Sequence, residues 1–201
     1  MPNQELKGGY IFHPDIYIFA VMEPRIFIDT PRLTLRGWKL ADEAPYIALN
    51  GDKQVMEFFP SVATGVETIA QIKRFKDHID RHGYGFFAVA RKDNGQFIGF
   101  TGLSHPRFEA DFTPCVEIGW RLSRENWGLG FATEAAFACL DYGFNFLGID
   151  EIYSFTSVHN LRSENVMKKI GMVKQGYFEH PSMEDGHVLK RHVLYKITKN
   201  L

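Results

Sequence analysis

The stretch over residues 114–135 constrains the fold of this chain more than any other part of its sequence. Residues 115–122 favour a strand, and they contain a single acid, Glu117, set among apolar neighbours. Gly128 and Gly130 follow, and glycine adopts backbone angles that other residues avoid. After these glycines, small and apolar residues recur at steps of three and four, which is typical of a helix. The pattern therefore predicts a strand, a glycine turn and a helix.

A helix that begins directly after glycines exposes unpaired N–H groups and the positive end of its dipole, so it accepts phosphate without a lysine. A P-loop needs Lys followed by Ser or Thr after the glycines, and neither pair stands there. A dinucleotide site needs a third glycine where Thr133 stands. Asp150 opens the next predicted strand, and from that position it cannot reach a ribose. A third kind of site, a pyrophosphate loop for coenzyme A, remains.

The motifs along the chain, in this order and at this spacing, resemble those of the GNAT superfamily of N-acetyltransferases. They are EIGWRL at 117–122, WGLGFATEA at 127–135, NLRSENVM at 160–167 and GM at 171–172. The chain resembles in particular the RimJ/RimL-type branch, the ribosomal-protein N-acetyltransferase-like proteins. One position departs from the family, because Glu125 stands where the loop often carries Gln or Arg.

The resemblance implies an α/β fold of the GNAT-like acyl-CoA N-acyltransferase type, with a mixed sheet of six or seven strands and helices on both faces. We expect residues 25–201 to form one N-acetyltransferase domain and residues 1–24 to be an N-terminal extension of uncertain structure. The implied activity is transfer of the acetyl group of acetyl-CoA to a primary amine, on a protein N-terminus or a small molecule. The competing hypotheses are a coenzyme A-binding module for sensing or assembly without catalysis, and a nucleotide-binding protein.

Glu117 is the candidate general base. A carboxylate on an apolar strand is costly to bury unless it is paired or partly neutral, and burial raises its pKa towards values that suit proton abstraction. The alternative is a glutamate whose side chain reaches solvent from a one-sided sheet. By resemblance, Asn160 contacts the pantetheine arm and Ser163 lies near the sulfur as a proton donor; equally, Asn160 fits a helix N-cap with Ser163 in the first turn. Tyr177 and Tyr195 are alternative donors.

The resemblance assigns the coenzyme contacts to the end of the strand, the glycine loop and the two helices that follow. The backbone of residues 120–123 is expected to pair with the pantetheine amides, and a local bulge there would free an N–H for the thioester oxygen. Arg121 and Arg124 flank the loop and either meet phosphates or are solvated. The expected coenzyme contacts are Arg121, Leu122, Ser123, Trp127, Gly128, Leu129, Gly130, Phe131, Ala132, Thr133, Asn160 and Ser163.

Hydrophobic periodicity and turn residues predict the other elements. The expected strands are 27–38, 86–91, 96–103, 152–157, 174–178 and 189–197, and the expected helices are 44–50, 53–59, 66–82, 131–147 and 160–170. Because a helix crosses over between them, strand 152–157 should run parallel to strand 115–122. The helices before Gly83 are expected to form one wall of the acceptor site.

The charge balance limits the partners. A net charge of −1 over 201 residues provides no basic field towards nucleic acid or membranes, so we expect neither as a partner. The expected partners are acetyl-CoA and the amine acceptor, and a homodimer is an arrangement that the sequence allows. Cys115 and Cys139 are expected to be buried thiols, which fits the cytoplasm.

The histidines do not predict a metal site. His78 and His82 are four residues apart on a predicted helix, a spacing that could hold a metal. No acidic third ligand follows at a useful step, so we expect this pair to face solvent. His105 and His159 show no ligand spacing either.

Overall fold

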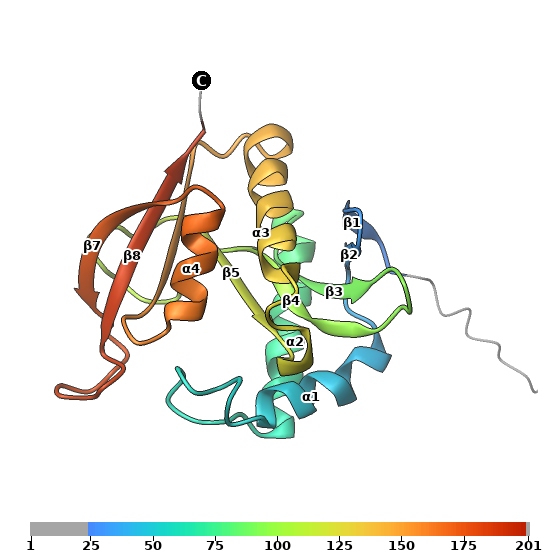
Figure 1. The fold of residues 1–201 in the computed structure, drawn as a ribbon, viewed down its shortest axis with the longest axis horizontal. Coiled ribbons are helices and arrows are strands. Elements are labelled where there is room, and N and C mark those ends of the chain that lie inside the picture. Colours follow the sequence, from blue (N-terminus) through green and yellow to red (C-terminus); the bar gives the residue numbers. More distant parts are fainter. Residues whose placement is uncertain (1–23, 200–201) are drawn as a thin grey trace, which may run out of the picture.

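The computed structural model describes residues 24–199, in which eight strands form one mixed sheet in the order β1-β2-β3-β4-β5-β6-β8-β7 (Figure 1). The strands are β1 (Ile26–Asp29), β2 (Leu33–Arg36), β3 (Phe86–Arg91), β4 (Phe97–Ser104), β5 (Glu117–Leu122), β6 (Glu151–Ser157), β7 (Val173–Glu179) and β8 (Arg191–Thr198). The helices are α1 (Glu43–Gly51), α2 (Gly65–His82), α3 (Phe131–Asp141) and α4 (Leu161–Lys169). Apart from Pro24, the predicted N-terminal extension lies outside the described residues.

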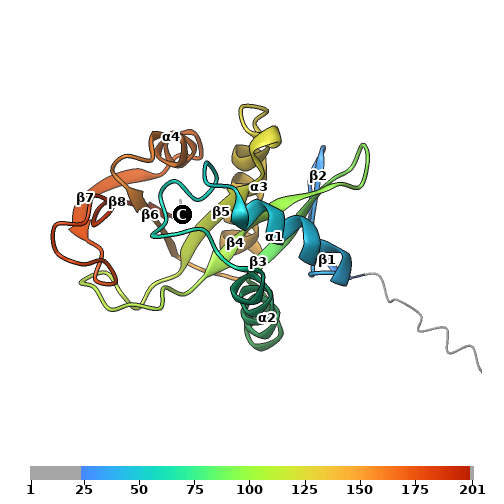
Figure 2. The same ribbon diagram turned by 90° about the horizontal axis from the view of Figure 1, so that it is seen from below.

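Short helical turns complete the architecture. The turns η1 (Leu40–Asp42) and η2 (Arg124–Asn126) are 3-10 helices, and η3 (Tyr142–Phe146) is a π-helical turn that prolongs α3. The predicted α/β class with helices on both faces is confirmed, since α2 lies on one side of the sheet and α3 and α4 on the other (Figure 2). None of the described helices combines the length and the apolar character that crossing a membrane requires.

The centre of the sheet contains its only parallel pair among the described strands. Neighbouring strands are antiparallel except β5 and β6, which run parallel as the α3 crossover predicts. Their register consists of one pair, Glu117 with Tyr153. Beyond that pair the two strands diverge, so the rest of β5 has a strand neighbour on the β4 side alone.

Two layers of core cover the sheet. Between the sheet and α3 lie buried apolar side chains, including those of Ile118, Leu122 and Cys139. On the α2 side, Phe75 and Phe100 have ring centroids 5.2 Å apart within a larger aromatic group. Helix α1 packs beside this aromatic group, against α2 and β4.

The sheet has one strand more than the six or seven predicted. The expected strand at 27–38 is two strands, β1 and β2, separated by a tight turn at residues 30–32. In that turn the Thr30 N–H donates to Leu33 O at 2.9 Å, and the Leu33 N–H donates to Thr30 Oγ1 at 2.9 Å. A proline next to a threonine that accepts backbone hydrogen bonds makes a turn here instead of a bend within one strand.

The predicted helix at 53–59 is wrong. This segment forms hydrogen-bonded turns, in which the Met56 N–H donates to Asp52 O at 3.0 Å and the Phe59 N–H donates to Met56 O at 2.9 Å. Side chains from distant elements hold these turns, as described below.

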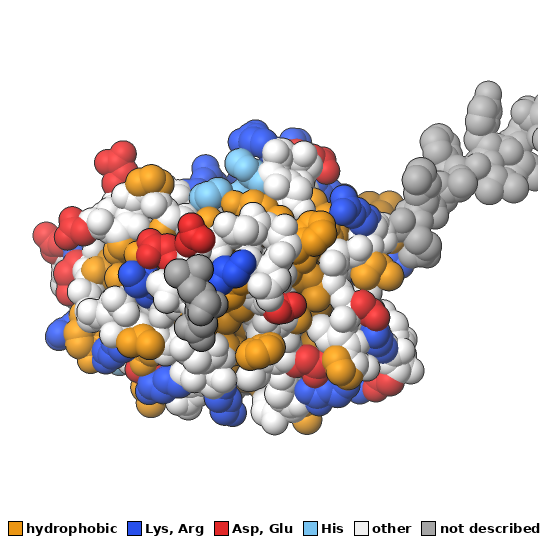
Figure 3. All heavy atoms as spheres, turned by 90° about the horizontal axis from the view of Figure 1, so that it is seen from above, with side chains coloured by type: hydrophobic (Ala, Val, Ile, Leu, Met, Phe, Trp, Pro, Cys, Tyr) orange, Lys and Arg blue, Asp and Glu red, His pale blue; other side chains and the backbone are white. Residues whose placement is uncertain are grey.

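The histidine pair on α2 does not simply face solvent. His78 is half-buried, its Nε2 has no hydrogen-bond partner, and its ring centroid lies 4.4 Å from that of His82. His105 packs beside both rings, at 5.6 Å from His78. In Figure 3, histidine side chains lie together at the surface. Among the described residues, no three His, Cys, Asp or Glu side chains are arranged to hold a metal.

Both cysteines are free thiols. Cys139 is buried within α3, as predicted, and burial raises the pKa of its thiol. Cys115 is half-buried and precedes β5 instead of lying within it, because the strand begins two residues later at Glu117.

Gly99 generates a stability prediction for the β4–β5 pairing. Its φ is 138°, and a Cβ there would lie 2.1 Å from Arg121 O. We expect Gly99→Ala to lower the free energy of unfolding by about 2–4 kcal/mol in urea denaturation, because strain and a backbone clash combine. Gly95→Ala is the matched control, since Gly95 has a φ of 71° but open space around it, and should cost about 1 kcal/mol. Equal losses in the two variants would contradict the tight β4–β5 approach.

Candidate functional site

The N-terminus of α3 carries unpaired main-chain donors. Gly130 is the N-cap residue, and no side chain caps the helix. The first α-helical hydrogen bond runs from the Glu134 N–H to Gly130 O at 3.0 Å. The N–H groups of Phe131, Ala132 and Thr133 therefore have no partner within the helix. Together with the helix dipole, they form a place where an anion can bind.

The glycine loop that precedes α3 has a defined shape. Gly128 and Gly130 have φ angles of 73° and 81°, in the left-handed region that favours glycine. Trp127 fixes the start of the loop, because its Nε1–H donates to Leu122 O at 2.8 Å. Leu129, between the glycines, is 49% exposed. The loop thus curves around the helix N-terminus without covering it.

An ionic contact attaches the start of α3 to the β1–β2 turn. Arg32 Nε lies 2.6 Å from Glu134 Oε2, and the Thr30 hydroxyl donates to Glu134 Oε1 at 2.7 Å. Arg32 Nη1 also donates to Leu129 O at 3.0 Å, which fixes the glycine loop. Glu134 therefore stabilises the helix start, as its position in the sequence suggests. Arg32 is a residue that the sequence analysis missed, since 97 residues separate it from Leu129.

The edge of β5 that faces β6 offers main-chain groups to a ligand. The Tyr153 N–H donates to Val116 O at 2.9 Å, so the even-numbered residues that follow Val116 along β5 also point their main-chain groups towards β6. The same alternation directs the peptide groups of Trp120 and Leu122 to that side, beyond the single register pair of Glu117 with Tyr153. An extended ligand with amide groups could pair with this edge.

The bulge expected near residues 120–123 is absent. The β4–β5 register is regular from Gly99 opposite Leu122 to Ser104 opposite Glu117. The free main-chain groups of β5 arise from its divergence from β6 instead. Ser123 follows the strand, and its hydroxyl accepts a hydrogen bond from Asn126 Nδ2 at 2.8 Å.

Glu117 lies half-buried at the point where β5 and β6 part. Its carboxyl makes no hydrogen bond or ion pair with any described residue, and burial raises its pKa to about 7. The alternative of a solvated glutamate on an open face does not fit this burial. Because the pKa is close to neutrality, the carboxyl can both accept and release a proton at pH 7.

Asn160 and Ser163 lie at the start of α4. Asn160 Oδ1 accepts a hydrogen bond from the Ser163 N–H at 3.2 Å, which confirms the predicted N-cap. Asn160 Nδ2 donates to Ser163 Oγ at 3.1 Å and to Thr156 Oγ1 at 3.0 Å. Ser163 Oγ therefore acts as an acceptor for Asn160, and its own hydrogen has no acceptor among the described residues. Coenzyme contact by these two residues stays a prediction.

The two tyrosines considered as proton donors differ from Ser163. The Tyr195 hydroxyl donates to Glu164 Oε1 at 2.8 Å, and burial together with this carboxylate raises the pKa of Tyr195 to about 12. Tyr177 is 54% exposed, and its hydroxyl accepts a hydrogen bond from Lys174 Nζ at 2.6 Å. The hydroxyl hydrogen of Tyr195 is therefore committed to Glu164, whereas that of Tyr177 has no acceptor among the described residues but lies at an exposed position.

The arginines that flank the loop do not extend to the N-terminus of α3. Arg121 Nη1 donates to Asn50 Oδ1 at 2.7 Å, and its guanidinium carbon lies 4.1 Å from the centre of the Phe59 ring. Arg124 Nη1 donates to Gln54 Oε1 at 2.8 Å. Both side chains thus contact α1 and the turns after it, so the phosphate contacts expected of them have no support in this geometry.

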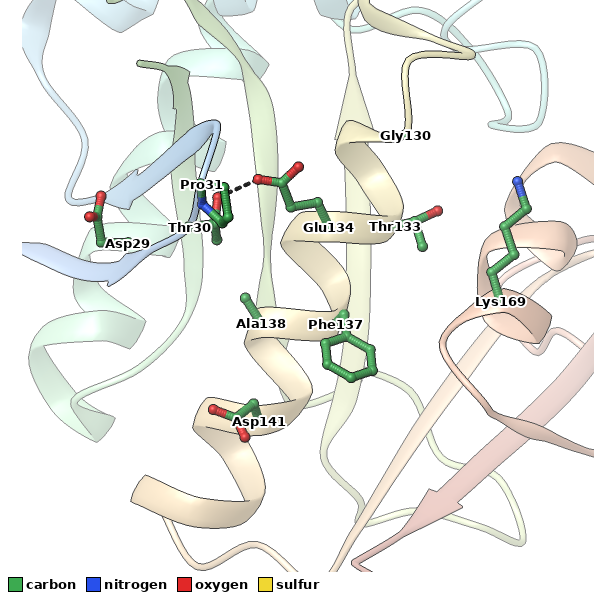
Figure 4. Close-up of a pocket in the computed structure, with 10 residues that line it drawn as sticks. All are labelled: Asp29, Thr30, Pro31, Gly130, Thr133, Glu134, Phe137, Ala138, Asp141 and Lys169. Atoms are coloured by element: carbon green, nitrogen blue, oxygen red, sulfur yellow. Dashed lines mark hydrogen bonds between the residues drawn. The ribbon is translucent and has the colours of Figure 1, made fainter. Parts of the chain in front are cut away.

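An open groove of about 630 Å³ runs along α3 from its N-terminus (Figure 4). Lys169 of α4 lies across the groove from Thr133 and Phe137 of α3, as Figure 4 shows. Lys169 forms no ion pair with any described residue. The groove lies on the α3 side of the sheet, away from the face that carries Glu117. Its lining residues are Asp29, Thr30, Pro31, Gly130, Thr133, Glu134, Phe137, Ala138, Asp141 and Lys169.

Comparison with known proteins adds to this geometry. The family described as the acetyltransferase (GNAT) domain matches residues 32–173. The uncharacterized N-acetyltransferase YnaD of Bacillus subtilis is 31% identical over 152 residues, which cover 76% of this chain and 85% of that protein. An acetyltransferase (GNAT family) from Bacillus anthracis superposes with a TM-score of 0.72 at 26% identity, covering 86% of this chain and 98% of that one. Spermidine N-acetyltransferase from Vibrio cholerae, solved with CoA and spermine, gives a TM-score of 0.65 at 22% identity, with coverage of 83% and 95%.

The unpaired carboxyl of Glu117 generates a pH-dependent stability prediction. Its pKa of about 7 lies above the ordinary value of 4.5, so the folded protein binds more protons than the unfolded chain between these values. The free energy of unfolding therefore falls as the pH rises from about 4.5 to about 7, because the carboxyl of Glu117 loses its proton while it is buried. We expect Glu117→Gln to raise the free energy of unfolding by under about 1 kcal/mol at pH 5 and by on the order of 3 kcal/mol at pH 8.

Urea denaturation of both proteins at the two pH values measures this difference. Glu109→Gln, at an exposed carboxylate, serves as the control and should stay within about 0.5 kcal/mol of the unsubstituted protein throughout. A Glu117→Gln effect that does not change with pH would show that the carboxyl is not held partly neutral by burial.

Proposed function

The chain belongs to the GNAT family of acetyl-CoA-dependent acyltransferases, and from this premise we propose that Glu117 is the general base for direct attack of a primary amine on acetyl-CoA. The observation that carries the proposal is the carboxyl of Glu117, half-buried and unpaired among the described residues, with a pKa of about 7. It lies beside the one stretch of β5 that β6 leaves open. The acceptor is a protein N-terminus or a small-molecule amine.

The coenzyme is proposed to bind through main-chain groups. Its diphosphate would accept hydrogen bonds from the N–H groups of Phe131, Ala132 and Thr133, which have no partner within α3. Its pantetheine amides would pair with the open edge of β5 at the peptide groups of Trp120 and the N–H of Leu122, as an added strand does, since Leu122 O already accepts from Trp127 Nε1. Lys169, at the groove along α3, would face the phosphate on the ribose.

The chemical step moves two protons. An amine with a pKa of about 10.4 is neutral in only about one molecule in two thousand at pH 7, so a base is needed. Glu117 takes a proton as the amine nitrogen forms a bond to the acetyl carbon, and the carbon–sulfur bond breaks. The thiolate receives a proton from Ser163, whose hydroxyl hydrogen is free because Asn160 supplies the hydrogen bond to its oxygen. The serine oxygen regains a proton from water, and Glu117 releases its proton to water, which restores the site. A main-chain N–H of the open β5 edge would donate to the thioester oxygen.

Other attributes also belong to the proposal. The RimJ/RimL-type branch rests on the motifs at 117–135 and 160–172, and the cytoplasm rests on the two free thiols. One domain over residues 25–201 and a homodimer remain predictions. A coenzyme A-binding module without catalysis is the alternative, and acetyl-CoA binding without thiol release from any amine would favour it.

Glu117→Gln tests the base directly. We expect this variant to bind acetyl-CoA as the unsubstituted enzyme does and to lose about ten-fold or more in kcat/KM at pH 7. Because a base acts when deprotonated, the pH profile of kcat/KM of the unsubstituted enzyme should bend near pH 7, whereas the variant should follow only the neutral fraction of the amine and rise without a bend there. Thiol release with a panel of amines is the readout, and Glu109→Gln is the control. Identical pH profiles would remove Glu117 from the mechanism.

Lys169→Gln tests the groove along α3. We expect the dissociation constant for coenzyme A to rise about three- to ten-fold, as for loss of one exposed charge contact. Lys168→Gln is the matched control, because Lys168 pairs with Glu164 at 3.1 Å instead of facing the groove. With dephospho-coenzyme A as the ligand, the effect of Lys169→Gln should vanish. Equal losses for both ligands would contradict contact with the ribose phosphate.

A further inference from the structure

Arg121 is a charged side chain that forms no ion pair with a carboxylate of the described residues. It lies on β5 on the same face as Glu117, with Gly119 between them, because strand residues two apart share a face. Its guanidinium makes one hydrogen bond to the described residues, from Nη1 to Asn50 Oδ1. Its Nε is closed off from solvent without a hydrogen-bond partner, and no carboxylate of the described residues pairs with Arg121. An enclosed charge without a counter-ion is costly.

The chain shows elsewhere how it satisfies a buried arginine. Arg36 of β2 is buried, and its Nη1 and Nη2 donate to Asp42 Oδ2 and Oδ1 at 2.7 and 2.8 Å. That pair uses two parallel hydrogen bonds from one edge of a guanidinium to one carboxylate. Arg121 has the same kind of enclosed setting, but an amide oxygen stands where a carboxylate would be.

The surroundings hold Arg121 in a fixed orientation. Asn50 Nδ2 donates to Thr68 Oγ1 at 3.1 Å and to Gln71 Oε1 at 3.3 Å, which turns the Asn50 oxygen towards Arg121. The ring of Phe59 lies against the guanidinium, an arrangement that attracts a cation without neutralising it. Burial lowers the pKa of Arg121, but a guanidinium titrates so far above neutral pH that Arg121 remains charged.

One nitrogen of the guanidinium, Nη2, remains for a ligand. Asn50 occupies Nη1, and the edge formed by Nε and Nη2 makes no hydrogen bond with the described residues. Nε is closed off from solvent, so Nη2 is the nitrogen that can donate a hydrogen bond to an oxygen of a carboxylate. Arg121 as a residue keeps some exposure, and Nη2 is not sealed off as Nε is.

We propose that Arg121 binds a carboxylate of the amine acceptor, so that the substrate class is an amino carboxylate with its amine at Glu117. This inference rests on the proposed acetyl transfer. The Cα atoms of Glu117 and Arg121 are four residues apart on a strand, about 13 Å, and both side chains emerge on one face. Arg121 also repels a second positive charge, which disfavours polyamines as acceptors.

Matched acceptors test the proposal on the unsubstituted enzyme. A series of ω-amino carboxylates of increasing chain length is compared with the corresponding carboxamides, at saturating acetyl-CoA, by thiol release. We expect kcat/KM for the best carboxylate to exceed that of its carboxamide by about ten-fold or more, since loss of a charged hydrogen-bond partner leaves Arg121 unsatisfied. Spermidine should be a poorer acceptor than the best carboxylate. No carboxylate preference at any chain length would overturn the proposal.

Arg121→Gln locates the effect. We expect this variant to lose the carboxylate preference while its dissociation constant for acetyl-CoA stays within about two-fold, because the Arg121 side chain points away from the N-terminus of α3. Arg74→Gln removes a charge from the exposed surface of α2 and should keep the preference. Retention of the preference in Arg121→Gln would also overturn the proposal. Failure of acetyl transfer itself is distinguishable, since then no amine, carboxylate or carboxamide would release thiol.

Discussion

The separation of β5 from β6 is the constraint on which the rest of the site depends. The two strands are held together at Glu117 and Tyr153, and beyond this pair β5 has no strand neighbour on one side, where Leu122 O accepts from Trp127 Nε1. Main-chain polar groups inside a protein need partners, so an open edge at the centre of a sheet must face solvent or a ligand. The crossover between the same two strands ends in α3, and it brings the bare N–H groups of the helix close to that opening.

Two charged side chains on β5 contrast with the satisfied charges around them. Arg36 has Asp42, and Arg32 has Glu134, so these pairs fix the β2–α1 connection and the start of α3. Glu117 lacks such a partner among the described residues, and so does Arg121, although both are half-buried. Enclosed charged groups without a partner lower the stability of a fold. They are concentrated at sites that act on a ligand, where this loss of stability serves a function. The face of β5 therefore combines a titrating carboxyl with a fixed cation.

Local patterns in the sequence predicted most of the fold. Gly83 and Gly171 end helices in the left-handed region, and Asn160 caps α4, because each depends on neighbours within a few residues. The turn that splits β1 from β2 was missed, although Thr30 next to a proline carried the signal. The chemical identity of Glu117 was also visible, since an acid among apolar strand residues stands out.

What the sequence could not predict depends on contacts between distant residues. The turns at 53–59 follow from contacts with Arg121, Arg124 and Arg162, which local periodicity does not contain. The same contacts draw Arg121 and Arg124 away from the glycine loop, where proximity in sequence had suggested phosphate binding. The open edge of β5 likewise comes from strand divergence, a property of the whole sheet, and not from a bulge in one strand.

Main-chain recognition of acetyl-CoA is the central claim, and amide hydrogen exchange measures it most directly. The folded protein is compared with and without saturating acetyl-CoA, with resolution to single amides. The account predicts new protection at Phe131, Ala132 and Thr133 and at Trp120 and Leu122, where partners are missing in the protein alone. Binding that leaves these five amides exchanging at their original rates, or no binding at all, would contradict it.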